Sequence, residues 1–550
     1  MVRRGLIVTN DATAGEVDAT ALDAEIAAER ASGGSDHAAA VSRGIMRAAV
    51  IITLGNVFSR LLGFARDLLT AVLFGASVQT DGYFTALRVQ TSIYDLLVSG
   101  VISAAFIPVF SAIRDDDARF RRVGSTILTI TLLVMAVAMG ALELFARDAI
   151  QLLDPQKKPD VLRTGVDALR LLGPAVIFLG LSGVLTAMLY AKQRFVFPAF
   201  SPAVFNLSIV VAAIGLSHFL GITSLVVGVV GGAAAQVVLQ AYGLRRVRLW
   251  PTLALRDPHV RQILLLSAPV FLGLIITQGQ VLIDLRFANG TGDAGLSYLT
   301  YATRLIQLPL GIVATAMSLA SLPMLSRLEG ADYRATLARG LKITLILILP
   351  AVVVCGVLAD PVIALAFQHG PKFKALQTAQ TAAALRYYTP GLAFAAVDQL
   401  LIFAFYAKND TKTPVVVGVI SIVCYLVVAL ATLHPLSFRG LALADSAKQF
   451  SHAAVLYVLL RRWQGRIEGL ELGGALGRIL LAGAAMGLLC YGLLRLADAV
   501  HWTTGALHLL VFLALTIGAG AALYGLLLYR LGVPELSLLV QRLGGRFRHG

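Results

Sequence analysis

Long apolar runs follow one another along almost the whole chain and are separated by short polar connections. A run of about 20 apolar residues is long enough to cross the hydrocarbon core of a bilayer as a helix. Fourteen such spans are predicted, near residues 46–74, 82–111, 123–146, 164–191, 199–219, 223–243, 262–287, 295–326, 337–359, 376–407, 414–433, 439–460, 474–497 and 505–529. The pattern therefore predicts an all-α polytopic membrane protein with about 14 transmembrane helices.

Lys and Arg are concentrated in every second connection between the predicted spans. If the N-terminus is cytosolic, the even-numbered connections should also be cytosolic and rich in Lys and Arg. Their basic residues are Arg114, Arg119, Arg121, Arg122, Lys192, Arg194, Arg245, Arg246, Arg248, Arg256, Arg261, Arg327, Arg334, Arg339, Lys408, Lys412, Arg461, Arg462 and Arg466. The opposite connections hold at most Lys157 with Lys158, or Lys372 with Lys374. Both termini are therefore predicted to be cytosolic.

Two pairs of motifs repeat at nearly one spacing. Residues 103–111 and 318–326 both end a predicted span with a Ser- and Ala-containing run followed by proline, and their prolines, Pro108 and Pro323, are 215 residues apart. A Tyr-Ala-Lys tripeptide precedes Pro198 and another precedes Pro414, 216 residues later. This offset contains six spans, an even number, so the two halves have the same orientation. We therefore predict parallel repeats related by an axis along the membrane normal.

The repeat divides the chain into four regions. Residues 1–42 are rich in Ala, Asp, Glu, Ser and Gly and are expected to form a largely disordered cytosolic tail. Residues 43–243 form the predicted N-lobe and residues 244–460 the predicted C-lobe, with six spans each. Residues 461–550 carry the last two spans and a cytosolic tail. Transporters built from such repeats bind their substrate between the lobes.

Composition narrows the class of protein. The 550 residues are 57% hydrophobic and 14% charged, with a mean hydropathy of +0.80, which is typical of a polytopic membrane protein rather than a soluble enzyme. The net charge of +15 could indicate a nucleic-acid binder, but the basic residues lie in short connections and not on one solvated face, so no nucleic-acid partner is expected. Three widely separated cysteines without CxxC spacing indicate neither a disulfide framework nor a metal site.

Catalytic motifs are missing from the sequence. It contains no GxxxxGK[ST] phosphate-binding loop, no HExxH and no Ser/His/Asp spacing, and its nine histidines are assigned to connections or the tail. A transporter without its own ATPase is therefore favoured over an enzyme, and no cofactor is expected. Its energy would come from Na⁺ or H⁺ coupling, the membrane potential or the substrate itself.

Three ionised side chains lie inside the first predicted span, within residues 59–67. Charges near the centre of a bilayer cost roughly 2.5–3.5 kcal/mol each on insertion scales, so such residues usually line a polar cavity. Arg60, Gly63 and Asp67 fall on one helical stripe, and Arg66 lies to one side of it. A positive stripe with one acid suits an anionic substrate, although Asp67 is better explained as the partner of Arg66 than as a substrate contact.

Further charges lie in the spans of both predicted lobes. Asp81 and Arg88 belong to the second span, and Arg304 lies in the eighth, one residue beyond the repeat equivalent of Arg88. Arginine presents a planar fork of donors that matches phosphate and diphosphate groups. Several arginines facing one cavity would bind a diphosphate head group. For Arg88, close to a helix end, snorkelling to the interface is an equal alternative.

Three acids, Asp284, Asp398 and Asp410, lie in or near spans 7, 10 and 11 and could take up Na⁺ or a proton. The alternatives are a pair between Asp284 and Arg286, and a solvated turn around Asp410.

Residues 43–460 carry a series of short motifs in this order: Ser59-Arg60, Gly63, Arg66-Asp67, Phe74-Gly75-Ala76, Thr80-Asp81, Ala105-Phe106-Ile107-Pro108, Phe197-Pro198-Ala199, Pro202, Asn206, Tyr301-Ala302, Arg304, Pro309, Asp410 and Lys412-Thr413-Pro414. Through these motifs the chain resembles the lipid II flippase family (MurJ, also called MviN) of the MOP superfamily. The resemblance implies a MATE-like inner-membrane flippase that moves the undecaprenyl-diphosphate-linked peptidoglycan precursor outward by alternating access.

The resemblance also implies roles for individual residues. The matching charges are Arg60, Arg66, Asp67, Asp81 and Arg304, with the arginines holding the diphosphate. A sodium site found in some members is carried onto Asp284 and Asp410. A cell-wall synthesis complex is an implied partner.

One motif departs from the family pattern. In span 2, where many members carry a basic pair and then a Glu, this chain has Tyr94-Asp95 and then Ser99, which is expected to remove positive charge from the cavity and add an acid. The sequence therefore leaves other functions open: a flippase for another polyprenyl-diphosphate glycan such as an O-antigen unit, a cation-coupled multidrug exporter, or a scaffold without transport activity.

Overall fold

The computed structural model describes residues 51–154, 159–369, 371–465, 472–500, 502, 505–533 and 535. Every regular element in that part of the chain is a helix. The predicted all-α class is therefore confirmed, while the predicted tail over residues 1–42 lies outside the described residues.

The helices form two bundles followed by a pair of C-terminal helices. The first bundle contains a helix over residues 51–74, α2 (Val78–Tyr94), π-helical turns η1 (Asp95–Ser99) and η2 (Ile102–Phe106), α3 (Ile107–Ala112), α4 (Asp117–Leu153), α5 (Pro159–Leu171), α6 (Gly173–Ala191), α7 (Val196–Leu220) and α8 (Thr223–Gly243). Next come α9 (Pro258–Asn289), α10 (Gly295–Pro309), the π-helical turn η3 (Leu310–Ala314), α11 (Thr315–Leu325), α12 (Gly330–Val357), α13 (Ala359–Phe367), α14 (Ala375–Tyr406), α15 (Lys412–Leu436) and α16 (Phe438–Gln464). The last pair is α17 (Leu472–Ala499) and α18 (Ala506–Arg530).

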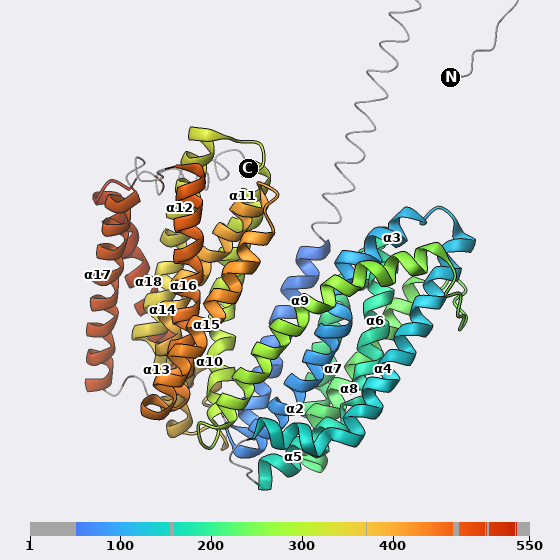
Figure 1. The fold of residues 1–550 in the computed structure, drawn as a ribbon. Coiled ribbons are helices and arrows are strands. Elements are labelled where there is room, and N and C mark those ends of the chain that lie inside the picture. The colour runs from blue at the N-terminus through green and yellow to red at the C-terminus, as the bar shows by residue number, and fades with distance from the viewer. Residues whose placement is uncertain are drawn as a thin grey trace, which may run out of the picture.

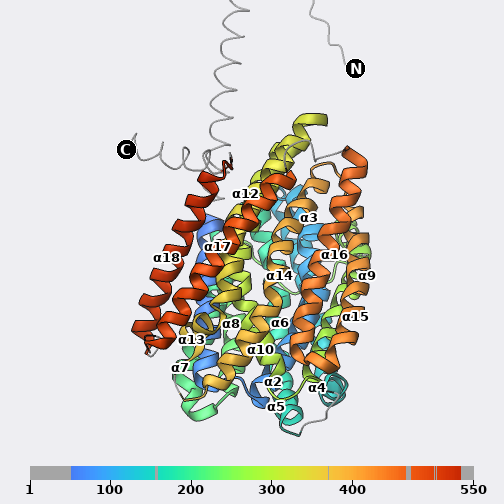
Figure 2. The same ribbon diagram turned by 90° about the vertical axis from the view of Figure 1, so that its left-hand side faces the viewer.

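The two bundles meet at one end of the molecule and diverge toward the other (Figure 1). Helix α9 runs diagonally across the first bundle to the place where the bundles meet, packing on α4, η1, η2 and α2 of the first bundle and on α10 and α16 of the second. Helices α17 and α18 pack on each other and on α12 and α13, so they flank the second bundle on the side away from the first (Figures 1 and 2). The bundles are therefore farthest apart at the diverging end.

The described residues contain nine helices that are long and apolar enough to cross a membrane. Their outer faces are apolar as well: along α15, Val415, Ile420, Val423 and Val427 are all exposed. Exposed apolar stripes of this kind suit lipid and not water. The chain is a multi-pass membrane protein, and the total of fourteen crossings stays a prediction.

The predicted span over residues 164–191 is divided in two. Helix α5 ends at Leu171, and α6 begins with Gly173 and Pro174 in its first turn. Proline lacks the amide hydrogen that a continuous helix would need, but it fits the first turn of a new one. Of these two helices, α6 is long and apolar enough to cross a membrane and α5 is not.

The internal repeat is visible in the backbone. Helices α7 and α15 both have 25 residues and begin 216 positions apart. They end at residues with nearly the same left-handed conformation, Gly221 (φ 55°) and Ser437 (φ 54°). The π-helical turns η1 and η3 begin 215 positions apart, at equivalent places in spans 2 and 8. The two halves thus share local geometry as well as sequence motifs, in agreement with the predicted two-lobe fold.

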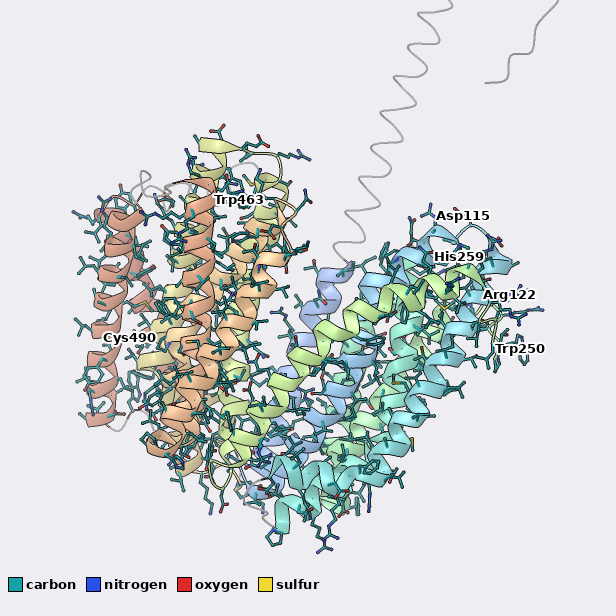
Figure 3. The ribbon with its side chains drawn as sticks, in the orientation of Figure 1. Asp115, Arg122, Trp250, His259, Trp463 and Cys490 are labelled. Atoms are coloured by element: carbon teal, nitrogen blue, oxygen red, sulfur yellow. The ribbon has the colours of Figure 1, made fainter. Side chains whose placement is uncertain are left out.

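Three of the connections expected on the cytosolic side lie at the diverging end. Asp115, Arg122, Trp250, His259 and Trp463 come from three even-numbered connections or the helix ends beside them, and all lie at that end in Figure 3.

Candidate functional site

Two adjoining cavities lie between the bundles. The larger, about 410 Å³, is lined by Ser59, Arg60, Gly63, Phe64, Arg66, Asp67, Asn206, Arg304, Gln307, Leu308, Leu310, Gly311 and Gln399, and we call it the basic cavity. The smaller, about 170 Å³, includes Arg88, Asp284, Thr303, Tyr388, Tyr425 and Asp445 in its lining, and we call it the mixed cavity. Arg304 and Gln307 line both, so the two spaces adjoin.

Asp67 connects the two bundles inside the basic cavity. Nε and Nη2 of Arg66 donate to its Oδ1 at 3.0 and 2.8 Å. Its Oδ2 lies 3.0 Å from Nε of Arg304, which comes from α10 in the second bundle. The Asp67 side chain is only 8% exposed, so this shared ion pair is largely shielded from water. One carboxylate therefore holds an arginine from each bundle.

Asn206 fixes the other side of Arg66. Its Oδ1 accepts from Nη1 of Arg66 at 3.0 Å, and its Nδ2 donates to the Ser59 carbonyl at 3.1 Å. Gly63 faces the Asn206 amide, and a Cβ added there would lie 3.4 Å from the amide nitrogen, an ordinary contact distance. The sequence motif contains Asn206, but nothing local in the sequence predicts its pairing with a residue 140 positions away.

Arg60 is the arginine of the basic cavity without an ion-pair partner among the described residues. It is exposed, and its guanidinium lies against Gly311 so closely that a Cβ at that glycine would collide with it. Gly311 belongs to η3, and π-helical turns inside α-helices occur often at functional sites. The turn and the glycine together make room for a free cation between the bundles.

The mixed cavity carries both signs of charge. Arg88 and Arg304 face it together with Asp284 and Asp445, so its lining is balanced. The basic cavity holds three arginines and one aspartate, a net charge of +2. The sequence analysis did not select Asp445, although it carries the same signal as Asp284, an acid within an apolar span. The charge difference between the two cavities favours an anion in the basic one.

Asp81 lines neither of these cavities. Its Oδ1 accepts from the backbone N–H and the hydroxyl of Ser297, at 2.8 and 2.6 Å, and Asp81 as a whole is only 2% exposed. It therefore joins the start of α2 to the first turn of α10. This position suits a structural link between the bundles better than contact with a substrate.

The converging end of the bundles is closed by aromatic packing. Tyr301 of α10 lies at its centre, with its ring 5.7 Å from Phe84, 5.2 Å from Phe367 and 5.8 Å from Phe373. Its hydroxyl donates to the Gly75 carbonyl at 3.0 Å. The bundles are thus sealed on this side by contacts that include residues of both.

The two acids of the predicted sodium site have different surroundings. Asp284 lines the mixed cavity. Asp410 precedes α15 and accepts from the Thr413 hydroxyl at 2.6 Å and from the Thr413 and Lys412 amides at 2.9 and 3.1 Å. The bonds from Thr413 hold the pKa of Asp410 below its usual range. Among the described residues no three His, Cys, Asp or Glu side chains gather as a metal site, and the sodium site stays a prediction.

Two expectations from the sequence need correction. Tyr94 and Asp95 do not appear in the lining of either cavity, so in this conformation the altered span 2 adds no acid to them. The assignment of all histidines to connections or the tail is wrong, because His452 lies inside α16 and is 8% exposed. The position of His452, an ionisable residue within an apolar run, could have shown that it lies in a helix.

The comparisons with known proteins decide the family. The model of the family described as "Lipid II flippase MurJ" matches residues 70–513, most of the chain. The chain belongs to the MurJ lipid II flippase family. Among the family's curated members, the lipid II flippase MurJ of Burkholderia cenocepacia is 29% identical over 395 residues, covering 68% of this chain and 76% of that protein. The probable lipid II flippase MurJ of Vibrio cholerae is 28% identical over 523 residues, covering 90% of this chain and 97% of that protein.

Solved structures show the same fold. A structure titled lipid II flippase MurJ, inward closed conformation, superposes with a TM-score of 0.74 at 23% identity, covering 88% of this chain and 99% of that one. An inward-facing multidrug resistance MATE transporter of the MOP superfamily superposes with a TM-score of 0.60 at 16% identity, covering 75% and 95%. The two-lobe architecture predicted from the repeat, and the MATE-like fold implied by the family resemblance, are therefore confirmed.

Proposed function

We propose that this protein is a flippase that translocates lipid II, the undecaprenyl-diphosphate-linked peptidoglycan precursor, from the cytoplasmic to the outer leaflet for cell-wall synthesis. Membership of the MurJ family supports this function, since its curated relatives carry lipid II flippase in their names. The observation that carries the proposal is the basic cavity, where Arg60, Arg66 and Arg304 from both bundles face one space of about 410 Å³. Such a cavity suits a diphosphate.

The charges of the basic cavity suggest how the diphosphate acts. Arg60 is free to bind it first, whereas Arg66 and Arg304 are already shared by Asp67. A diphosphate that enters competes with Asp67 for both arginines. Since Asp67 is the ionic contact between the bundles inside this cavity, release of Arg304 from it would loosen the bundles and favour their rocking.

The proposed orientation follows from charge. Three of the basic connections lie at the diverging end, among them the one beside Arg122, so this end would face the cytoplasm by the positive-inside rule. The open cavity would then receive substrate from the inner leaflet, while the aromatic contacts around Tyr301 close the outer side. The protein would lie in the bacterial inner membrane with both termini cytosolic, and the lipid tail would remain in the bilayer.

Energy coupling is proposed to use an ion or the membrane potential, with no organic cofactor. The carboxylates of Asp284 and Asp445 in the mixed cavity provide hard oxygen atoms next to the proposed diphosphate site. A cation there would partly neutralise them. A cell-wall synthesis complex is the proposed partner downstream of the flipped lipid.

Complementation tests the function. A bacterium depleted of its own lipid II flippase should be rescued by this chain, and Arg60→Ala and Arg304→Ala should fail although inserted in the membrane at normal levels. Arg122→Ala is the matched control, because Arg122 is an exposed arginine near the connection before α4 and lines neither cavity. Failure of the wild-type chain would contradict the function, whereas rescue by both cavity variants would contradict only the role of the arginines.

Another polyprenyl-diphosphate flippase is the main alternative, because the basic cavity would accept the same diphosphate. Rescue of a strain that lacks an O-antigen flippase, without rescue of the lipid II strain, would favour it. A cation-coupled multidrug exporter would instead be indifferent to Arg60→Ala.

A further inference from the structure

A buried acid and a buried histidine meet inside the second bundle, away from the two cavities. Asp398 of α14 is 7% exposed and His452 of α16 is 8% exposed. Nδ1 of His452 lies 2.5 Å from Oδ1 of Asp398, and its Nε2 lies 3.2 Å from the backbone carbonyl of Pro414, in the first turn of α15. The imidazole thus connects three neighbouring helices of the C-terminal bundle.

The two contacts of His452 determine how many protons the pair holds. A backbone carbonyl can only accept, so Nε2 must carry a hydrogen to bond Pro414. The contact between Nδ1 and the carboxylate then needs a second hydrogen, either on Nδ1 or on Asp398 itself. In both cases the pair carries one proton more than a neutral histidine beside an ionised aspartate, and its net charge is zero.

We propose that Asp398 and His452 form a proton-binding site that is occupied in this conformation and that fastens α16 to α14 and to the start of α15. Loss of the proton would leave two facing lone pairs at one of the two contacts and an uncompensated negative charge among buried helices. Such a charge is costly to bury. Proton release is therefore linked to separation of these three helices.

Few charged residues lie near the pair of Asp398 and His452. Helix α14 contributes Asp398 alone between Tyr388 and Tyr406, and α15 contributes no charged side chain between residues 413 and 433. On α16, Lys448 lies one turn before His452, and its charge acts on Asp398 and His452 as well as on the cavity carboxylates Asp284 and Asp445.

Helices α9 and α10 also pack on α16. The charged side chains that these helices contribute to the mixed cavity are Asp284 and Arg304. Lys448 therefore links the proton site electrostatically to the mixed cavity without lying in the diphosphate site.

The pH dependence has a definite sign. A histidine in the unfolded chain releases its proton near pH 6.5. Above that pH the folded protein holds a proton that the unfolded chain has lost, so stability falls as the pH rises, until the folded pair has also released it. One proton shifts the folding equilibrium by up to tenfold per pH unit.

Thermal unfolding of the purified full-length protein in nanodiscs, measured from pH 6 to 9 without substrate, tests the proposal. Asp398→Asn supplies the hydrogen permanently, because its amide can donate to Nδ1 while Nε2–H still donates to Pro414. We expect the wild-type melting temperature to fall with rising pH. The melting temperature of Asp398→Asn should fall much less over the same range. His434→Gln, which changes an exposed histidine near the end of α15, should follow the wild type.

Parallel pH profiles for the wild type and Asp398→Asn would overturn the proposal. If Asp398→Asn does not fold, the double variant Asp398→Asn with His452→Gln provides the same comparison, because neither amide binds a proton and the new amide at position 452 can still donate to Pro414. A wild-type melting temperature that is constant over the range would overturn the proposal without any variant. Because no substrate is present, failure of this test would leave the flippase function untouched.

Discussion

Replacement of Arg60 by alanine removes the free cation of the basic cavity. The guanidinium is exposed, has no ion-pair partner among the described residues and lies against the Gly311 backbone. Its loss should therefore leave the packing of the bundles intact, in contrast to changes at Asp67. The fold should be unaffected, and the loss should appear in ligand binding.

The size of the effect follows from the contacts that are lost. A hydrogen bond between charged groups contributes roughly 1.5–3 kcal/mol. A factor of ten in affinity corresponds to about 1.4 kcal/mol, so Arg60→Ala should weaken binding of a diphosphate by about 10- to 150-fold. Arg60→Lys keeps the charge but loses the planar fork, so its effect should be smaller.

The assay is calorimetric titration of the protein in nanodiscs with a short-chain polyprenyl diphosphate, with Arg122→Ala as the control. The wild-type affinity should also decrease with added salt, since the cavity is open to water and charges are screened there. Equal affinities of the wild type and Arg60→Ala would refute the role given to Arg60. An equal loss in Arg122→Ala would show a nonspecific charge effect instead.

Three further changes give separate expectations. Gly311→Ala should displace the Arg60 guanidinium and weaken diphosphate binding by less than Arg60→Ala does, in the same titration; unchanged affinity would contradict the contact. Asp81→Ala leaves the Ser297 amide without its acceptor and should cost about 1.5–3 kcal/mol of stability, seen as a lower melting temperature with normal diphosphate affinity. Asp410 has a lowered pKa, so its stabilising effect is present at neutral pH and is lost as the pH falls. Asp410→Asn should retain the bonds from the Thr413 and Lys412 amides, since the Asn side-chain oxygen also accepts, and should reduce the loss of melting temperature toward pH 3; an unchanged acid profile would contradict this.

Much of the fold could be predicted because the bilayer imposes simple rules on sequence. Helix length, apolar faces and the alternation of positive charge are local properties, and the 215-residue repeat then gives the two-lobe arrangement. The break between α5 and α6 was missed because the apolar run continues through Gly173 and Pro174. The diagonal course of α9 was not predictable either, since it depends on packing against both bundles.

The candidate site was predictable in its charges but not in its pairing. Arg60, Arg66 and Arg304 were selected because ionised residues in apolar spans are costly, and the structure places all three in one cavity. The partners of these charges come from distant positions, as Asn206 does for Arg66 and Ser297 for Asp81. Such contacts depend on how helices far apart in sequence pack, which local spacing does not show.

If the basic cavity carries the diphosphate of lipid II across the membrane, the purified protein should move lipid II between leaflets. Proteoliposomes that contain the purified protein and fluorescent lipid II, treated with a membrane-impermeant quencher, measure the fraction of lipid that changes leaflet with time. We expect translocation by the wild type well above protein-free vesicles and its loss in Arg304→Ala, with Arg122→Ala like the wild type. Wild-type translocation no faster than in protein-free vesicles, or undiminished translocation by Arg304→Ala, would contradict this role of the basic cavity.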